Sequence, residues 1–382
     1  MKKNFFLLFS SILITLFLIY FIIFIKFFFE QRDDTQYLFN SIQSLNFHKK
    51  YSNILNHLRN SNLGWDNDDN YDNYLYSVIE NYNDSKKNIL FQGDSWMEQI
   101  NLEKESLMTV KNFSQKNNLG TINGGTTSFS PTLMKLQYKI LKKDFNIKPN
   151  IVVAYIDQTD VGDEICRYKN KRYFDKNNNL LGIKRDKFSR SIYDYSKIYK
   201  KSEIYLNYKN DFIKNFHLTN FFIEFKIKRL IVKIKNIGLY GLKNKDQARC
   251  YYGEIQNYLK NYLTEEDKAY FLNSIENYIN TIINDPNIHT LLLVTFPHRN
   301  NLYEKDHIDY YKVNVSNLIE EKLKKINSKK IKHINFTKDF EKNSKIDFKI
   351  FREGDPASHL NETPHNEIFI KKILVNIKKV IN

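Results

Sequence analysis

Apolar runs alternate with helix-spaced apolar residues along the middle and C-terminal parts of the chain. Five of these runs have the length and composition of buried strands. They are Asn88 to Phe91, Gly120 to Asn123, Asn150 to Ile156, Thr290 to Thr295 and Ile331 to Phe336. Strands that alternate with helices imply parallel pairing. The pattern therefore predicts an α/β sandwich.

Two helices of this sandwich are marked by their own signals. The segment Thr264 to Asn284 opens with Thr-Glu-Glu-Asp, a variant of the capping box, and continues with helix-spaced apolar residues. It is expected to cross over into the strand at Leu291 to Val294. From Glu367 onward the apolar residues form one stripe, which predicts a closing helix laid on the sheet. The stripe consists of Ile370, Ile373, Leu374, Ile377 and Ile381.

The N-terminal stretch Phe5 to Ile25 carries no charge and is almost wholly apolar. At about 1.5 Å per residue it is long enough to cross a hydrocarbon core of about 30 Å. No signal-peptide cleavage site follows it. We therefore predict an uncleaved signal anchor at 5–25 behind a cytoplasmic tail at 1–4. The rest of a single-pass membrane protein would then be extracytoplasmic, with residues 26–85 as a stalk and helical lead-in.

About a hundred extra residues separate the third predicted strand from the crossover helix, far more than an ordinary connection. This mainly helical insertion is expected at about 163–253. Its stretch Phe221 to Ile237 is apolar and basic together, which suits either packing on the core or a cap that faces substrate or membrane. Near its start, Asp175, Asn177 and Asn179 alternate as in a calcium loop, but leucine replaces the required glycine. A tight turn between short strands is preferred there.

The strongly basic composition does not by itself identify an acidic binding partner. The formal charge of +16 and the pI near 9.3 would suit an acidic partner, but lysine is frequent throughout the chain rather than clustered. No helix-turn-helix, zinc-finger or RNA-binding motif occurs, so no nucleic-acid partner is expected. The two cysteines, Cys166 and Cys250, cannot form a disulfide framework or a four-ligand zinc site. They can pair outside the cytoplasm or remain thiols.

The first predicted strand runs directly into a turn and a helical pattern, at Gln92-Gly93-Asp94-Ser95-Trp96. A serine that attacks a carbonyl must stand at the open end of a sheet with a backbone N–H beside it, and a strand that breaks into a helix provides both. Glycine permits the sharp turn, and Asp94 can hydrogen-bond back into it. Taken alone, the motif equally fits a loop with a helix N-cap.

The decisive partners lie near the C-terminus, where Asp355 to Asn361 has the sequence Asp-Pro-Ala-Ser-His-Leu-Asn. With Gly-Asp-Ser early and Asp-His late, residues 86 to 381 resemble the SGNH (GDSL-type) hydrolases, apart from the insertion. The resemblance implies a three-layer α/β/α sandwich with a mostly parallel, flavodoxin-like, five-stranded sheet at 86–382. It also implies Ser95 as nucleophile, His359 as base and Asp355 as the acid that orients it. Three residues separate the acid from the histidine, where the family usually has two, which leaves Glu353 and Glu362 as alternative acids.

The resemblance also implies the donors of an oxyanion hole. The backbone N–H of Ser95 is one. The block that follows the second strand places Ser128 where the family has its donor glycine, so Ser128 must adopt glycine-like dihedrals. After the third strand the family shows Gly-x-Asn-Asp, whereas this chain shows Asp-Gln-Thr-Asp at 157–160. Thr159 or Gln158 is then the candidate third donor, while the aspartates of this block can equally cap the turn.

These residues predict an extracytoplasmic serine esterase or O-acyltransferase that acts on acyl esters, with acetyl favoured, of a cell-envelope glycan. The glycan follows from the resemblance alone. No cofactor and no metal is expected, and a metal site of Asp355, His359 and His365 is a minor alternative. A catalytically inactive protein that binds glycan or an envelope-assembly partner is the main alternative. A membrane-surface protein with a vestigial cleft is the third.

Overall fold

The computed structural model describes residues 75–83, 86–183, 263–341, 347–355 and 357–381, together with short pieces of 10–25, 54–55 and 212–223. The chain divides into two compact units. The larger consists of Ser52–Leu58, Asn73–Lys184 and Lys245–Asn382, and the smaller of Met1–Tyr51, Arg59–Asp72 and Arg185–Asn244. The described ranges leave out most of the predicted stalk at 26–85 and most of the predicted insertion at about 163–253. The predicted strands and site residues all belong to the larger unit.

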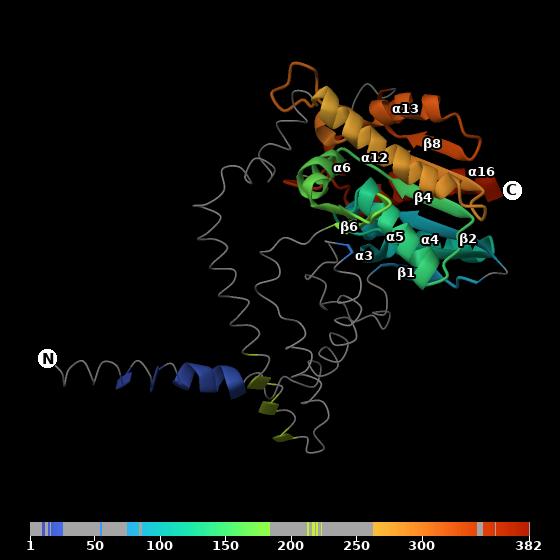
Figure 1. The fold of residues 1–382 in the computed structure, drawn as a ribbon. Coiled ribbons are helices and arrows are strands. Elements are labelled where there is room, and N and C mark those ends of the chain that lie inside the picture. The colour runs from blue at the N-terminus through green and yellow to red at the C-terminus, as the bar shows by residue number, and fades with distance from the viewer. Residues whose placement is uncertain are drawn as a thin grey trace. The chain divides into compact units, whose positions relative to one another are not determined.

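The larger unit is built on a mixed sheet of six strands in the order β1-β3-β2-β4-β7-β8 (Figure 1). All five strands predicted from the sequence are present and run parallel to their neighbours among these five. They are β2 (Lys87–Gln92), β3 (Leu119–Asn123), β4 (Ile151–Tyr155), β7 (Thr290–Thr295) and β8 (Ile331–Asn335). The α/β class and the mostly parallel pairing are thereby confirmed.

The expected count of five strands was wrong, because a short edge strand precedes the first predicted one. This strand, β1 (Ser77–Glu80), pairs antiparallel with β3 and comes from the segment assigned to the stalk. Within it only Ile79 is buried. One buried residue in four leaves too little alternation to distinguish an edge strand from a loop.

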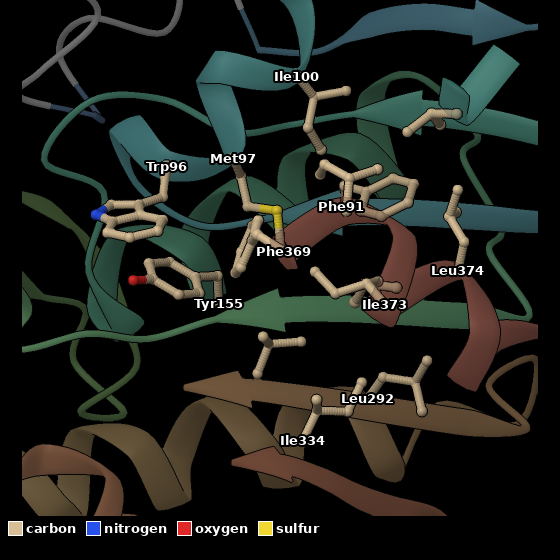
Figure 2. Packing of buried hydrophobic residues seen from close by; sticks show 14 of the residues in the cluster. Phe91, Trp96, Met97, Ile100, Tyr155, Leu292, Ile334, Phe369, Ile373 and Leu374 are labelled. Atoms are coloured by element: carbon tan, nitrogen blue, oxygen red, sulfur yellow. The ribbon is translucent and has the colours of Figure 1, made fainter. Parts of the chain in front are cut away.

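Helices cover both faces of the sheet (Figure 1). On one face, α3 (Ser95–Leu102), α4 (Lys104–Lys116) and α16 (Lys371–Ile381) share an apolar cluster with Ile89, Phe91 and Val153 of the strands (Figure 2). Successive strand residues point to opposite faces. The neighbouring Gln92 accordingly lies on the other face, where it contacts helices α5 (Pro131–Asp144) and α12 (Glu265–Ile283).

The two helices predicted from the sequence, one from its capping box and one from its apolar stripe, are both present. Helix α12 begins after Thr264, whose hydroxyl accepts a hydrogen bond from the Asp267 N–H, and it leads into β7. The closing segment starts at α15 (Glu362–Pro364), passes through a π-helical turn, η6 (His365–Ile370), and ends in α16. Its predicted apolar stripe is buried at Ile370, Ile373, Leu374 and Ile377.

The described start of the insertion folds onto the larger unit. It contains α6 (Thr159–Gly162), the π-helical turn η2 (Asp163–Tyr168), the 3-10 turn η3 (Lys169–Lys171), and a hairpin of β5 (Arg172–Phe174) and β6 (Leu180–Ile183). The hairpin confirms the predicted tight turn, because the Asp175 carboxylate accepts the N–H groups of Asn177 and Asn179. Cys166 of η2 is disulfide-bonded. The other cysteine of the sequence, Cys250, lies outside the described residues.

The predicted membrane anchor at 5–25 falls only partly on described residues, among which 17–25 are helical. Within the described part of the chain, no helix has both the length and the apolar character needed to span a membrane. The signal anchor and the extracytoplasmic location stay predictions.

Candidate active site

Ser95 is positioned by the sharp junction between β2 and α3. The junction is Gly93, which has φ +157° and lies so close to its neighbours that a Cβ would come within 2.8 Å of Met97 Cγ and 3.0 Å of Tyr155 Cβ. Asp94 then caps α3, because its Oδ1 accepts the Trp96 N–H at 2.9 Å. A glycine followed by a capping aspartate therefore places Ser95 at the first position of the helix.

His359 and Asp355 are held in a tight loop before the closing helix. A bridge between Phe351 and Leu360 closes the loop, and Ser358 adopts a left-handed φ of +56°. The Asp355 carboxylate accepts the N–H of Ala357 at 2.9 Å and that of His359 at 3.2 Å. This local wrapping accommodates the additional residue between acid and histidine that the sequence showed.

The structure brings these two loops together in one hydrogen-bonded chain. His359 Nε2 lies 2.7 Å from Ser95 Oγ, and His359 Nδ1 lies 2.5 Å from Asp355 Oδ2. Burial alone would raise the pKa of Asp355, but the hydrogen bond from His359 and its charge outweigh burial and lower it to about 2. An ionised Asp355 fixes the imidazole so that Nε2 can accept the serine proton.

Ser128 has the backbone conformation that its predicted role requires. Its φ is +63°, a left-handed value that serine rarely adopts, and its amide N–H makes no hydrogen bond within the described residues. Arg167 of η2 donates to its hydroxyl, and Tyr168 donates to its carbonyl oxygen at 2.6 Å. The start of the insertion thus fixes the loop that carries this candidate oxyanion donor.

The same loop is pressed against the helix that carries the nucleophile. A Cβ on Gly125 would lie 2.4 Å from the Glu98 backbone nitrogen in the first turns of α3. Only glycine permits this approach. The two candidate donors, the N–H groups of Ser95 and Ser128, therefore come from elements in direct backbone contact.

The other candidate donors are already hydrogen-bonded to protein groups. The Thr159 hydroxyl donates to Asp157 Oδ1 at 2.7 Å. The Gln158 amide donates to the Val313 carbonyl at 2.6 Å and accepts the Val315 N–H at 3.1 Å. Either side chain would have to exchange partners to reach an oxyanion. Their roles stay predictions.

A cluster of buried acids, which sequence reasoning treated only as turn caps, lies beside this site. Asp94, Asp157 and Asp160 each have a carboxylate oxygen within 4.8 Å of the others. Burial first, and then the charge of Asp157, raise the pKa of Asp94 and of Asp160 well above ordinary values. Burial also raises the pKa of Asp157, although hydrogen bonds from Thr159 oppose it. The available signal was Asp157, an acid where the resemblance expects glycine.

The remaining candidate histidines serve local structure. His365 is fully buried, with Nδ1 2.8 Å from Ser106 Oγ and 3.0 Å from a carboxylate oxygen of Glu103. Its Nε2 faces the Trp96 carbonyl at 3.2 Å, so it braces α3 rather than joining Asp355 in a metal site.

Comparisons of the chain with protein-family models, with curated proteins and with solved structures found no match. The functional argument therefore rests on the geometry above.

Proposed function

We propose that this chain is an SGNH-like serine hydrolase or O-acyltransferase that cleaves acyl esters through Ser95, His359 and Asp355. The observation that carries the proposal is the hydrogen-bonded chain from Asp355 through His359 to Ser95, assembled from loops 264 residues apart. The 2.7 Å between His359 Nε2 and Ser95 Oγ lies within the range expected of a nucleophile and its base.

The strand order gives independent support. Among the five parallel strands the order β3-β2-β4-β7-β8 corresponds to 2-1-3-4-5, the flavodoxin-like arrangement. In such three-layer sheets, ligands bind at the carboxyl ends of the strands, where the chain order reverses. Ser95 follows β2, Ser128 follows β3 and Thr159 follows β4. The candidate residues thus occupy the edge that this topology favours for a ligand.

The chemistry follows from these positions. Ser95 Oγ attacks the acyl carbon while His359 Nε2 takes the hydroxyl proton, and ionised Asp355 stabilises the resulting imidazolium. The N–H groups of Ser95 and Ser128 face the oxyanion that develops. His359 then returns the proton to the leaving alcohol. Water resolves the acyl-enzyme in an esterase, and a sugar hydroxyl does so in a transferase.

The proposed compartment and substrate rest on separate support. Disulfides persist mainly outside the cytoplasm, and Cys166 is disulfide-bonded. This agrees with an exported main domain behind a signal anchor at 5–25. The acylated, most often acetylated, envelope glycan is proposed from the resemblance to anchored SGNH proteins.

Active-site labelling tests the proposal. The full-length protein in detergent is treated with a fluorophosphonate probe, and wild type is expected to label while Ser95→Ala does not. Ser106→Ala is the matched control, since Ser106 also contacts a histidine nitrogen at 2.8 Å but is fully buried. Ser106→Ala should retain labelling when folded.

A folded wild-type protein that does not label would contradict the hydrolase. It would favour the inactive binding protein, whose structural support is that Thr159 and Gln158 are engaged elsewhere. Labelling that persists in Ser95→Ala would show that another residue reacts.

A further inference from the structure

Three buried carboxylates lie together beside the nucleophile, and each is oriented by the backbone through one oxygen. Asp94 Oδ1 accepts the Trp96 N–H, Asp157 Oδ1 accepts the Thr159 N–H, and Asp160 Oδ2 accepts the Asp157 N–H. Caps of this kind satisfy one oxygen and fix where the other points. The second oxygens are thus held in defined positions.

Two of those second oxygens, on Asp160 and Asp94, have almost no protein partners among the described residues. Asp160 Oδ1 makes no hydrogen bond within the described residues, although it is buried. Asp94 Oδ2 has only a long contact of 3.4 Å with the Thr159 hydroxyl. Buried carboxylate oxygens are normally hydrogen-bonded or bound to a cation.

A tyrosine hydroxyl independently points to the same place. Tyr155 is fully buried, and its hydroxyl makes no hydrogen bond of good geometry within the described part of the chain. Among the described residues, its one side-chain interaction of this kind is a loose contact with Asp157 of the cluster. Figure 2 shows this hydroxyl directed away from the apolar side chains of Ile373 and Leu374. Burial raises the pKa of Tyr155, and the charges of Asp157, Asp94 and Asp160 raise it further. The hydroxyl therefore faces the carboxylates.

The cluster also lacks a compensating positive charge. Among the described residues, no lysine or arginine forms an ion pair with any of the three acids, while neighbouring Asp163 pairs with Arg167 at 2.9 Å. Hydrogen bonds from Thr159 favour ionised Asp157 most, and the positive charge that does so is that of His359. An uncompensated buried carboxylate costs several kcal/mol, on the order of the whole stability of many domains.

We infer that Asp94, Asp157 and Asp160 bind one hard divalent cation, with Ca²⁺ the best match. The donors are all oxygens, from three carboxylates with the Tyr155 and Thr159 hydroxyls beside them. Oxygen-only sets of this kind select Ca²⁺ or Mg²⁺, and Ca²⁺ tolerates the less regular geometry. Imidazole and thiolate ligands, which softer metals prefer, are absent from this cluster of described residues.

Such a cation would lie next to the proposed catalytic site, since Asp94 precedes Ser95 and Thr159 stands where the resemblance expects a donor asparagine. Its positive charge would offset the acids on that side and favour a developing oxyanion. This consequence rests on the proposed function. Binding of the cation does not, and it is measured separately.

Terbium luminescence provides the test on the full-length, chelator-treated protein. Tb³⁺ replaces Ca²⁺ at oxygen sites and is excited by a nearby aromatic ring, here Tyr155, with Trp96 at 5.3 Å between ring centroids. Tb³⁺ bound to wild type should give saturable emission. Ca²⁺ should displace Tb³⁺ and lower this emission, with a Kd for Ca²⁺ at or below about 10⁻³ M. Asp160→Asn should weaken Ca²⁺ binding by at least about tenfold.

Asp175→Asn is the matched control, because Asp175 belongs to the exposed hairpin turn and, among the described residues, its carboxylate oxygens bond only to groups of that turn. It should bind Ca²⁺ like wild type. Asp157→Asn gives a second ligand variant if Asp160→Asn does not fold. The inference fails if folded wild type shows no saturable Ca²⁺ binding up to about 10⁻² M, or if both ligand variants bind as wild type does. Fluorophosphonate labelling can succeed in either case, so failure of this site is distinguishable from failure of the hydrolase.

Discussion

Two groups of residues lie at the N-terminus of α3, the chain of Ser95, His359 and Asp355 and the acid cluster of Asp94, Asp157 and Asp160, and they differ in how their charges are balanced. On one side, Ser95, His359 and Asp355 form a chain in which each acceptor has a donor, and the pKa of Asp355 is lowered to about 2. On the other side, Asp94 and Asp160 are buried among acids, and their pKa values are raised. The two environments meet at Asp94 and Ser95, which are adjacent in the sequence.

The difference shows that burial of an acid does not by itself decide its ionisation. Asp355 is also penalised by burial, yet the imidazole beside it more than compensates. The cluster has the same penalty without a cationic side chain bonded to it in the described residues. The chain from Asp355 to Ser95 is therefore balanced within itself, whereas the neighbouring acids are balanced only by protonation or by the cation inferred above.

The largest expected effect distinguishes His359 of the proposed triad from the fully buried His365. His359→Ala should lower turnover of p-nitrophenyl acetate by about 10³-fold or more, because the base is lost. His365→Ala should instead destabilise the fold by about 3 kcal/mol, since it removes a fully buried imidazole and one of the two partners of buried Glu103, which keeps only Arg352 among the described residues. Rates and melting temperatures measured on both variants separate these outcomes. Equal rate losses in both folded variants would contradict the assignment of the base.

A smaller effect is expected at the contact between η2 and the Ser128 loop. Tyr168→Phe removes one hydrogen bond to the Ser128 carbonyl, typically worth about 1 kcal/mol, so kcat should fall about fivefold while KM stays unchanged. Tyr138→Phe removes a comparable buried hydrogen bond, from α5 to Asp285 just after α12, and is the matched control because neither residue contacts the Ser128 loop in the hydrogen bonds described. A kcat loss of the same size in the control would indicate a general loss of stability instead.

The smallest effect concerns pH and the catalytic acid. Because the folded-state pKa of Asp355 is about 2 and its ordinary value is 3.8, ionised Asp355 stabilises the fold above about pH 4. That contribution is lost as pH falls from 3.8 toward 2. Denaturant unfolding of wild type and Asp355→Asn should therefore give a stability difference that is constant near neutral pH and shrinks below pH 4. A difference that grows on acidification would contradict the lowered pKa.

The sequence was most informative where a pattern depends on neighbours along the chain. Apolar runs located the five parallel strands, and the Thr264 cap located α12, because both signals act within a few residues. The same holds for Gly93, whose turn places Ser95 at a helix start. The edge strand β1 was missed, since pairing with β3, not its own composition, makes it a strand.

Contacts between distant segments could not be predicted from the sequence. The additional residue between Asp355 and His359 suggested a displaced acid, and only the folded loop, with Ser358 in a left-handed conformation, shows how the hydrogen bond forms. The proximity of Asp94 to Asp160 likewise arises from two parallel strands that end at the same edge. The spacing of residues along the chain does not predict that these two carboxylates lie close together.

The support that η2 gives to the Ser128 loop bears on how this chain can be shortened. A deletion begun at the sequence-derived boundary of 163 would remove Arg167 and Tyr168, and with them both side-chain contacts described for Ser128. A deletion that starts beyond Ile183 would preserve the π-helical turn and the hairpin that follows it. Protein engineers who trim the long insertion should therefore keep its first twenty residues, because they support the loop of the proposed active site.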